Sequence, residues 1–179
     1  MELIAGDIGG TKSGLAWVKS EGTDTQEVRF EQVYASADFA TADDLIRQFI
    51  VDARQPVTAE SLLLALPGPL RGQHARLTNL EWTLDAADMQ ASLGVARVRF
   101  INDFQAAAAG VASLTATDVV ALNPQPVEAG GVRAITGAGT GLGVAFMLAD
   151  AEGRTRSFPS EGGHIDFAPA NAVQDRLLE

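Results

Sequence analysis

Residues 132–148 read VRAITGAGTGLGVAFML, a glycine-rich stretch between two apolar runs. Four glycines alternate there with single residues, so one edge of the stretch carries few side chains. Backbone N–H groups can then turn toward an anion, and a large ligand can approach closely. We therefore expect a hairpin whose turn binds phosphate, with the contacts made by Gly137, Gly139, Thr140 and Gly141.

A second copy of this pattern lies near the N-terminus. Residues 10–16 (GTKSGLA) share their order of Gly, Thr, Gly, aliphatic residue and Ala with residues 139–145 (GTGLGVA). Two such loops flanked by strand-like runs indicate a duplicated unit with a ligand between its halves. The phosphate contacts expected in the first copy are Gly6, Asp7, Ile8, Gly9, Gly10 and Thr11.

The composition limits the classes of function. The chain has 179 residues, of which 46% are hydrophobic and 20% charged, as in ordinary globular proteins. Its formal net charge of −10 argues against nucleic-acid partners. Apolar runs are far shorter than the roughly 18 residues of a membrane span. There is no cysteine, which excludes disulfides and thiol catalysis and agrees with a cytoplasmic location.

Hydrophobic periodicity and breakers predict a mixed α/β layer. We expect strands at 2–6, 13–19, 27–34, 61–66 and 98–101, with an antiparallel start to the sheet. Helices are predicted from Thr41 to before Pro56, between Asp85 and Gly94, and from 102–103 to about 112. A polar loop is expected up to Asn79, one short strand near Val119, and a helix starting at Asn171 that does not finish.

Two other nucleotide motifs fit poorly. Residues 6–13 (GDIGGTKS) differ from a Walker P-loop by Thr11 in place of glycine, and strand formers follow where that motif needs a helix. A dinucleotide fingerprint would need glycine at Leu142 or Val144. The glycine stretches therefore favour neither of these folds.

Polar side chains near strand ends are candidates for chemistry. Asp7 can reach phosphate-bound magnesium, and otherwise it only forms a turn. Asp103 can be a general base or an ordinary helix N-cap, and its sequence position favours neither. Glu161 and His164 flank two glycines and could contact a hydroxyl-rich small molecule, whereas a metal site there is not fixed by spacing. His74 lies in a polar loop and is expected to be solvated.

Five motifs in order resemble the bacterial glucokinase family of the sugar kinase, hsp70 and actin superfamily. Residues 7–11 (DIGGT) and 137–143 (GAGTGLG) resemble its two phosphate loops. Residues 78–82 (TNLEW) resemble a segment beside the sugar, and 101–104 (INDF) the segment with the catalytic aspartate. The most distinctive motif is EGGHIDFAP at 161–169. The implied fold is an actin-like ATPase (ribonuclease H-like) fold, a mixed sheet with flanking helices.

The resemblance implies a glucokinase that transfers the γ-phosphoryl group of ATP to the 6-hydroxyl of glucose. Asp103 would be the base, Asp7 would serve Mg²⁺, and the sugar contacts would be Asn79, Asn102, Asp103, Glu161 and His164. Alternatives are a kinase of another hexose or N-acylhexosamine, or a sugar-binding regulator without catalysis. Nucleic acid and membrane are not expected as partners. Whether the protein forms a homodimer is left open.

The resemblance also has departures. Lys12 and Gly14 stand where this branch of the family more often has Asn and Arg. Family members continue past residue 179, through a further sugar-contacting glutamate, an adenosine site and a final helix. We therefore expect residues 1–112 to form the N-terminal small lobe and 113–179 to begin the large lobe. The chain alone should bind ATP incompletely and be impaired or inactive.

Overall fold

The computed structural model describes residues 1–21, 25–77, 79–111, 113–123, 125, 128, 130–139 and 141–178. Thr78 and Thr140, which belong to the predicted motifs, lie outside the described residues. Strands and helices follow the chain in this order: β1 (Glu2–Ile8), β2 (Lys12–Glu21), β3 (Thr25–Ala35), η1 (Ser36–Asp38), α1 (Ala42–Asp52), β4 (Ser61–Leu66), β5 (His74–Leu77), β6 (Trp82–Asp85), α2 (Ala86–Leu93), β7 (Arg97–Asn102), α3 (Asp103–Val111), β8 (Arg133–Ala138), β9 (Leu142–Ala149), β10 (Thr155–Ser160), η2 (Gly162–His164) and α4 (Ala172–Asp175).

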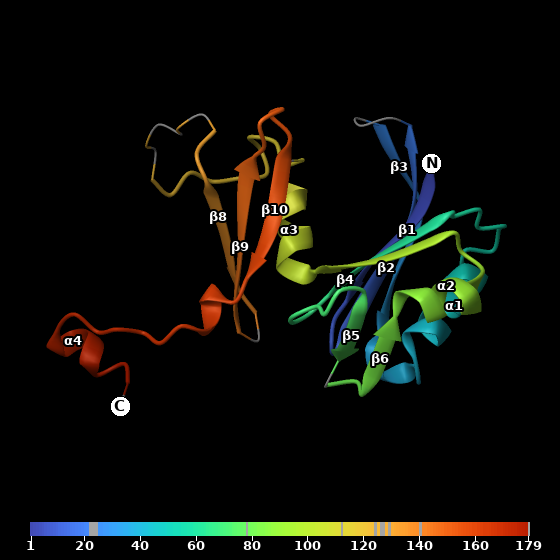
Figure 1. Ribbon diagram of the computed structural model, residues 1–179, viewed down its shortest axis with the longest axis horizontal. Helices are drawn as coiled ribbons and strands as arrows, with labels where there is room; N and C mark the ends of the chain where they lie inside the picture. The colour runs from blue at the N-terminus through green and yellow to red at the C-terminus, as the bar shows by residue number, and fades with distance from the viewer. Residues whose placement is uncertain are drawn as a thin grey trace.

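The first half of the chain forms a five-stranded mixed sheet in the order β3-β2-β1-β4-β7 (Figure 1). β1, β2 and β3 pair antiparallel, whereas β4 lies parallel to both β1 and β7. The antiparallel start and the mixed sheet are therefore confirmed. Because β2 follows the first glycine turn directly, the helix that a Walker P-loop requires is missing, and that alternative is excluded.

One face of this sheet is covered by α1, α2 and the β5–β6 hairpin, and the main core lies between them. α1 begins where predicted because the Thr41 side chain accepts the Asp44 N–H, and its apolar face buries Leu45 and Phe49. α2 is capped by Asp85 and ends at Gly94, whose φ of 69° suits glycine. Both helices form as the sequence predicts.

Two local predictions were wrong. The expected polar loop before Asn79 contains β5, which pairs with β6 and buries Leu77 and Trp82 in the core. Conversely, the described residues around Val119 form no strand, and Val120 is 84% exposed. β-Branched residues favour a strand only where a neighbouring strand supplies hydrogen bonds and packing. That partner exists for the β5–β6 hairpin, but no described strand pairs with the segment around Val119.

The second half of the chain forms a three-stranded antiparallel sheet, β10-β9-β8, and α3 lies between the two sheets (Figure 1). The predicted second glycine hairpin is therefore present. Ala108 of α3 packs with Ala145 and Met147 of β9 in a small second core. The division at 112/113 stays a prediction, and α3, which it assigns to the first lobe, packs on the second sheet.

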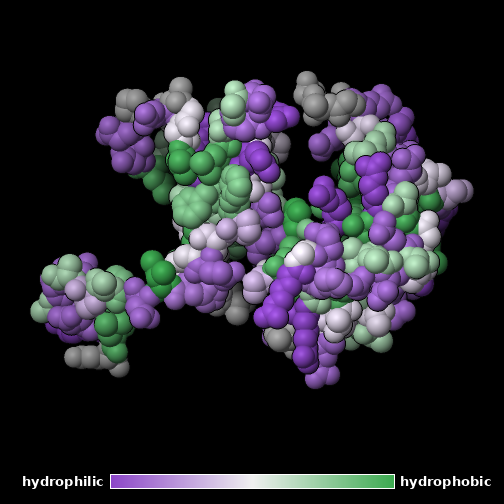
Figure 2. Space-filling view, viewed as in Figure 1, coloured by the Kyte–Doolittle hydropathy of each residue, from purple (hydrophilic) through white to green (hydrophobic). Residues whose placement is uncertain are grey.

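The other face of the second sheet is open. Successive side chains of a strand point to opposite faces, so Phe146 and Leu148 of β9 point away from α3. Phe158 of β10 pairs with Phe146, and all three side chains are partly exposed. Figure 2 shows hydrophobic side chains gathered over β9 and β10. No helix in the described ranges is long and apolar enough to cross a membrane.

Candidate active site

Asp7 and Asp103 lie at the same edge of the five-stranded sheet, with β4 between their strands. β1, β4 and β7 run parallel, so their carboxyl ends lie at the same edge. Asp7 lies near the end of β1, and Asn102 ends β7 directly before Asp103. Asn102 Nδ2 also donates to the carbonyl of Gly68, in the turn after β4 (3.2 Å). Ligands of open α/β sheets bind at this kind of edge.

The first glycine turn, residues 9–12, is tight. Gly9 N–H donates to the Lys12 carbonyl (3.0 Å), and a Cβ on Gly9 would lie 2.6 Å from that oxygen. A Cβ on Gly10 would lie 3.2 Å from Nδ2 of Asn79, which places the predicted sugar residue Asn79 beside this turn. Thr11 is exposed in the same turn. The structure therefore brings one predicted sugar contact next to the predicted phosphate contacts.

Gly6 and Ile8 have structural roles in β1. A Cβ on Gly6 would lie 2.6 Å from a methyl group of Leu15 and 2.7 Å from one of Leu64. Ile8 is fully buried in the main core. Only the backbone of these two predicted phosphate contacts can face a ligand.

The Asp103 carboxylate is held by one of its two oxygens. Oδ1 accepts from the backbone N–H of Phe104 (2.8 Å) and from Nδ2 of Asn102 (2.9 Å). Among the residues that the structure describes, no donor contacts Oδ2. The helix N-cap bond comes from Asn102, whose Oδ1 accepts the Gln105 N–H (3.1 Å), so the interpretation of Asp103 as the N-cap was wrong. Because β7 runs directly into α3, Asn102 provides the cap and leaves Oδ2 of Asp103 free.

The pKa of Asp7 depends in part on the Asp103 carboxylate. Partial burial and, second, the negative charge of Asp103 raise the pKa of Asp7 above its ordinary 3.8. A divalent cation relieves such repulsion, and Mg²⁺ is usually bound by one or two carboxylates together with substrate phosphates. The chemistry of this pair therefore fits a phosphate-bound Mg²⁺. No group of three or more metal-binding side chains occurs in the described ranges.

The second glycine turn, residues 137–143, packs against α3. A Cβ on Gly143 would lie 1.8 Å from the Phe104 ring, and one on Gly137 would lie 3.1 Å from it. At the tip, Gly139 N–H donates to the Gly141 carbonyl (2.8 Å), and a Cβ on Gly141 would meet nothing within 4 Å. Gly137 and Gly143 thus pack against an aromatic ring. At the tip, Gly141 leaves room for a ligand, whereas the Gly139 N–H is already bonded within the turn.

Glu161 and His164 form a separate, exposed pair. His164 Nδ1 lies 3.2 Å from Glu161 Oε2. The intervening Gly163 is packed so closely that a Cβ would lie 1.6 Å from the Leu142 carbonyl oxygen. Within the described ranges, no hydrogen bond or ion pair joins this pair to Asn102 or Asp103. His74 is exposed to solvent as predicted, with its side chain 70% exposed, and its Nδ1 lies 2.5 Å from Oδ2 of Asp85.

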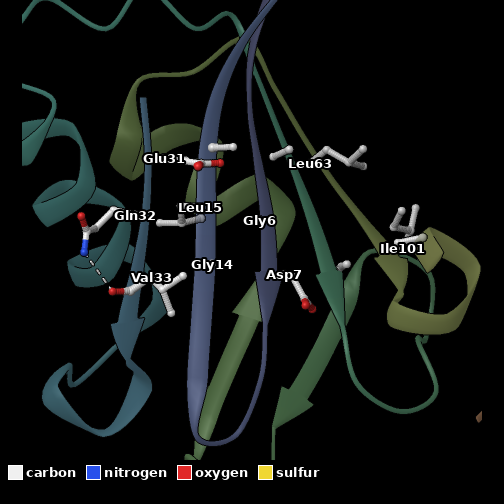
Figure 3. Close-up of a pocket in the computed structure, with 13 residues that line it drawn as sticks. Gly6, Asp7, Gly14, Leu15, Glu31, Gln32, Val33, Leu63 and Ile101 are labelled. Carbon is white, nitrogen blue, oxygen red and sulfur yellow. Dashed lines mark hydrogen bonds between the residues drawn. The ribbon is translucent and has the colours of Figure 1, made fainter. Parts of the chain in front are cut away.

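A cavity of about 720 Å³ lies on the sheet face opposite the main core (Figure 3). Six of its thirteen lining residues are Ala or Gly, and Asp7 is also among the thirteen. The cavity wall is mostly apolar, with Glu31 and Gln32 as its polar residues besides Asp7, so its chemistry differs from that of the polar sheet edge. It supplies room beside Asp7 but no further titratable group near Asp103.

Three residues of the site were missed by sequence reasoning. Ser13 and Ser36 are fully buried beneath the first glycine turn, and Phe104 fills the second. For Phe104 a signal existed, because it directly follows Asp103 in a helix whose other residues are mostly small. For the two serines no local pattern pointed to a partner, since they lie 23 residues apart.

Comparisons with known proteins agree on one family. A family described as Glucokinase matches residues 4–179. A glucokinase of Synechocystis sp. is 38% identical over all of this chain and over 53% of its own length, so the chain spans about half the length of the curated relatives it matches. The crystal structure of glucokinase from an Antarctic psychrotroph overlaps 99% of the chain and 55% of its own length, with a TM-score of 0.83 and 25% identity.

A second similar structure contains bound glucose. It is glucokinase from Balamuthia mandrillaris in complex with glucose, with a TM-score of 0.67 and 25% identity. The overlap covers 99% of this chain and 53% of that structure. Together these overlaps confirm the predicted actin-like fold class.

Proposed function

Since the chain belongs to the glucokinase family, we propose that its protein transfers the γ-phosphoryl group of ATP to the 6-hydroxyl of glucose, with Asp103 as the base. Kinase activity with glucose and ATP is the activity that this family carries. The chain spans about half the length of its relatives, so the proposal concerns the whole protein. A cytoplasmic location and Mg²⁺ as the metal belong to the same proposal.

The single observation that carries the proposal is the unequal use of the two Asp103 oxygens. Two donors fix Oδ1, so the carboxylate has one orientation. Oδ2 is left to accept a proton from a sugar hydroxyl at the sheet edge. A base in hydrogen-bond reach of the nucleophile typically contributes about 10²- to 10⁴-fold to the rate.

Asp7 and the two glycine turns supply the other half of the chemistry. Phosphoryl transfer depends mostly on positioning and charge stabilisation. Asp7 would hold Mg²⁺, which neutralises phosphate charge when bound. Gly10 and Thr11 would offer N–H groups to the phosphates, while the Gly9 N–H closes the turn on the Lys12 carbonyl. The raised pKa of Asp7 supports this role, because the repulsion from Asp103 falls when a cation binds. The second turn would contact phosphate through Gly139 and Gly141.

The sugar contacts come from three segments. Asn102 is fixed beside Asp103, Asn79 lies beside the first glycine turn, and Glu161 with His164 lies on the second half of the chain. The glucose complex of the Balamuthia mandrillaris relative supports glucose as the substrate. A panel of hexoses and N-acylhexosamines tests this choice, because the glycine turns do not select the sugar.

Replacing Asp103 by Asn tests the base. The amide oxygen of Asn can still accept both donors that fix Oδ1, but the amide nitrogen accepts no proton. We expect turnover of the whole protein to fall by about 10²- to 10⁴-fold while glucose affinity stays within a few-fold. A coupled ADP-release assay and glucose calorimetry measure the two effects, with Asp88→Asn on α2 as the control carboxylate. Near-normal turnover of Asp103→Asn would remove Asp103 from the mechanism.

A further inference from the structure

Two buried hydroxyl groups lie beneath the first glycine turn. Ser13 lies in β2, and Ser36 begins the short turn η1 that follows β3. Both are 0% exposed, and their Oγ atoms are 2.8 Å apart. They are the only fully buried polar side chains in the described part of the chain. Burial of a hydroxyl is costly unless it is hydrogen-bonded, so the bonds of this pair decide its purpose.

The two serines form a directed chain of hydrogen bonds that ends on the turn. Ser36 Oγ donates to the carbonyl of Gly9 (2.7 Å). A hydroxyl has one hydrogen, so Ser13 must be the donor in the bond between the two serines. The backbone N–H of Ser36 donates to the Thr11 carbonyl (3.0 Å). Ser36 therefore binds the turn at two carbonyls, whereas the Ser13 hydroxyl bonds only to Ser36 among the described residues.

The bond to Gly9 also orients the next amide. The peptide bonds of the described residues are trans, and in a trans peptide the C=O and the following N–H point in opposite directions. The Gly9 carbonyl points down to the buried Ser36 hydroxyl. The N–H of Gly10 therefore points away from the protein interior, and Gly10 is exposed. An N–H oriented in this way can donate to an anion.

We propose that Ser36 is a positioning residue that fixes the Gly9–Gly10 peptide so that Gly10 N–H is presented to a phosphate group. The proposal rests on the proposed function, in which this turn contacts the phosphates of ATP. Glycine on both sides lets the peptide rotate easily, so an external bond is needed to hold it. Without the Ser36 hydroxyl the Gly9 carbonyl has no donor among the residues that the structure describes, so the peptide turns toward another donor.

Ser13 provides a matched control. Ser36→Ala and Ser13→Ala each remove one fully buried hydroxyl from the same pair, so their packing changes are alike. Only Ser36→Ala removes the bond to Gly9, because Ser36 keeps its donor to that carbonyl when Ser13 is replaced. A purely structural role predicts equal phosphate affinity in the two folded variants, although Ser36→Ala loses more stability because it leaves the Ser13 hydroxyl and the Gly9 carbonyl unpaired. A positioning role predicts a larger loss of phosphate binding in Ser36→Ala.

The test titrates the ¹⁵N-labelled chain with inorganic tripolyphosphate and Mg²⁺ and follows the Gly10 amide by NMR. We expect the Gly10 signal to shift in the wild type, with half-saturation changed less than about threefold by Ser13→Ala and raised about tenfold by Ser36→Ala. Ser36→Cys keeps the side-chain shape with a weaker donor and should lie between them. If Ser36→Ala does not fold, Ser36→Cys decides, and unchanged affinity in it overturns the proposal.

The outcomes separate this proposal from the proposed kinase. Equal affinities in Ser36→Ala and Ser13→Ala, or a Gly10 amide that never responds in the wild type, overturn the role of Ser36 whether or not the protein phosphorylates glucose. The whole protein can also lack sugar kinase activity while its Gly10 response depends on Ser36. That result supports the positioning role of Ser36 and contradicts the proposed kinase function.

Discussion

In the first glycine turn the backbone folds back on itself, whereas in the second an aromatic ring from α3 fills the space between the strands. Gly9 is crowded by the Lys12 carbonyl oxygen, and the turn is held from below by Ser36. Gly143 is crowded by the Phe104 ring, 39 residues earlier in the chain by their numbers. The two turns share their residue order, yet their crowded glycines meet different neighbours.

This difference separates two uses of glycine that look alike in a sequence. In the first turn, glycine permits a close contact between backbone atoms of the turn itself. In the second, Gly143 and Gly137 permit α3 to approach the second sheet, and Phe104 is the residue directly after Asp103. The second turn therefore touches the helix that carries the proposed base. Substitutions at the two turns should therefore lower the stability of the chain through different contacts.

The largest effect is expected for Gly143→Ala. Its Cβ would lie 1.8 Å from the Phe104 ring, so the ring or the sheet must move. Overpacking of this kind typically costs about 1–3 kcal/mol of unfolding free energy. Gly141→Ala is the control, because a Cβ there meets nothing within 4 Å. Urea denaturation measures both, and equal stabilities would mean that Phe104 does not pack against the second turn.

A smaller effect is expected for Gly9→Ala. Its Cβ would lie 2.6 Å from the Lys12 carbonyl oxygen, which lengthens the bond that closes the first turn. We expect a loss of about 1–2 kcal/mol in unfolding free energy, together with weaker tripolyphosphate binding. Gly14→Ala in β2 is the control, because its nearest neighbour is a Val33 methyl group at 3.9 Å. Gly9→Ala with unchanged stability and unchanged binding would contradict the role of the tight turn.

The smallest effect concerns charge. Asp7 precedes the first turn, and the residue at the matching place in the second copy is Thr136. The folded-state pKa of Asp7 is raised above 3.8, so the folded chain binds this proton more tightly and loses stability as the pH rises through that window. Asp7→Asn should therefore gain stability relative to the wild type, and this gain should grow from about pH 4 to the raised pKa and persist above it. The gain should stay below about 1 kcal/mol because the carboxylate is only partly buried.

Thermal melting at several pH values measures this gain. Thr136→Val is the matched control, because no carboxylate titrates at that position and its effect should not depend on pH. A pH-independent effect of Asp7→Asn would show that neither burial nor the charge of Asp103 raises the pKa of Asp7. Loss of Mg²⁺-dependent tripolyphosphate binding in the same variant tests the metal role separately.

Much of the fold could be predicted because its signals are local. The glycine turns between apolar runs predicted both hairpins, and the caps Thr41 and Asp85 predicted α1 and α2. The β5–β6 hairpin was missed because strands of four residues show little periodicity. Leu77 and Trp82 are buried because they pack into the main core, which the local sequence does not show. The strand expected near Val119 does not form. Its β-branched residues favour a strand, but in the described ranges no neighbouring strand pairs with them.

By itself, the sequence determined the local elements and the identity of the residues with chemical potential: the glycine turns, Asp7, Asp103, Glu161 and His164. Only the tertiary structure decided which of them meet. The parallel pairing of β1, β4 and β7 brings Asp7 to Asp103, and the return of β3 places Ser36 under Gly9. Turns and caps depend on residues a few positions apart, whereas the neighbours that shift a pKa or orient a peptide come from distant segments. Their contacts exist only once the sheets have formed.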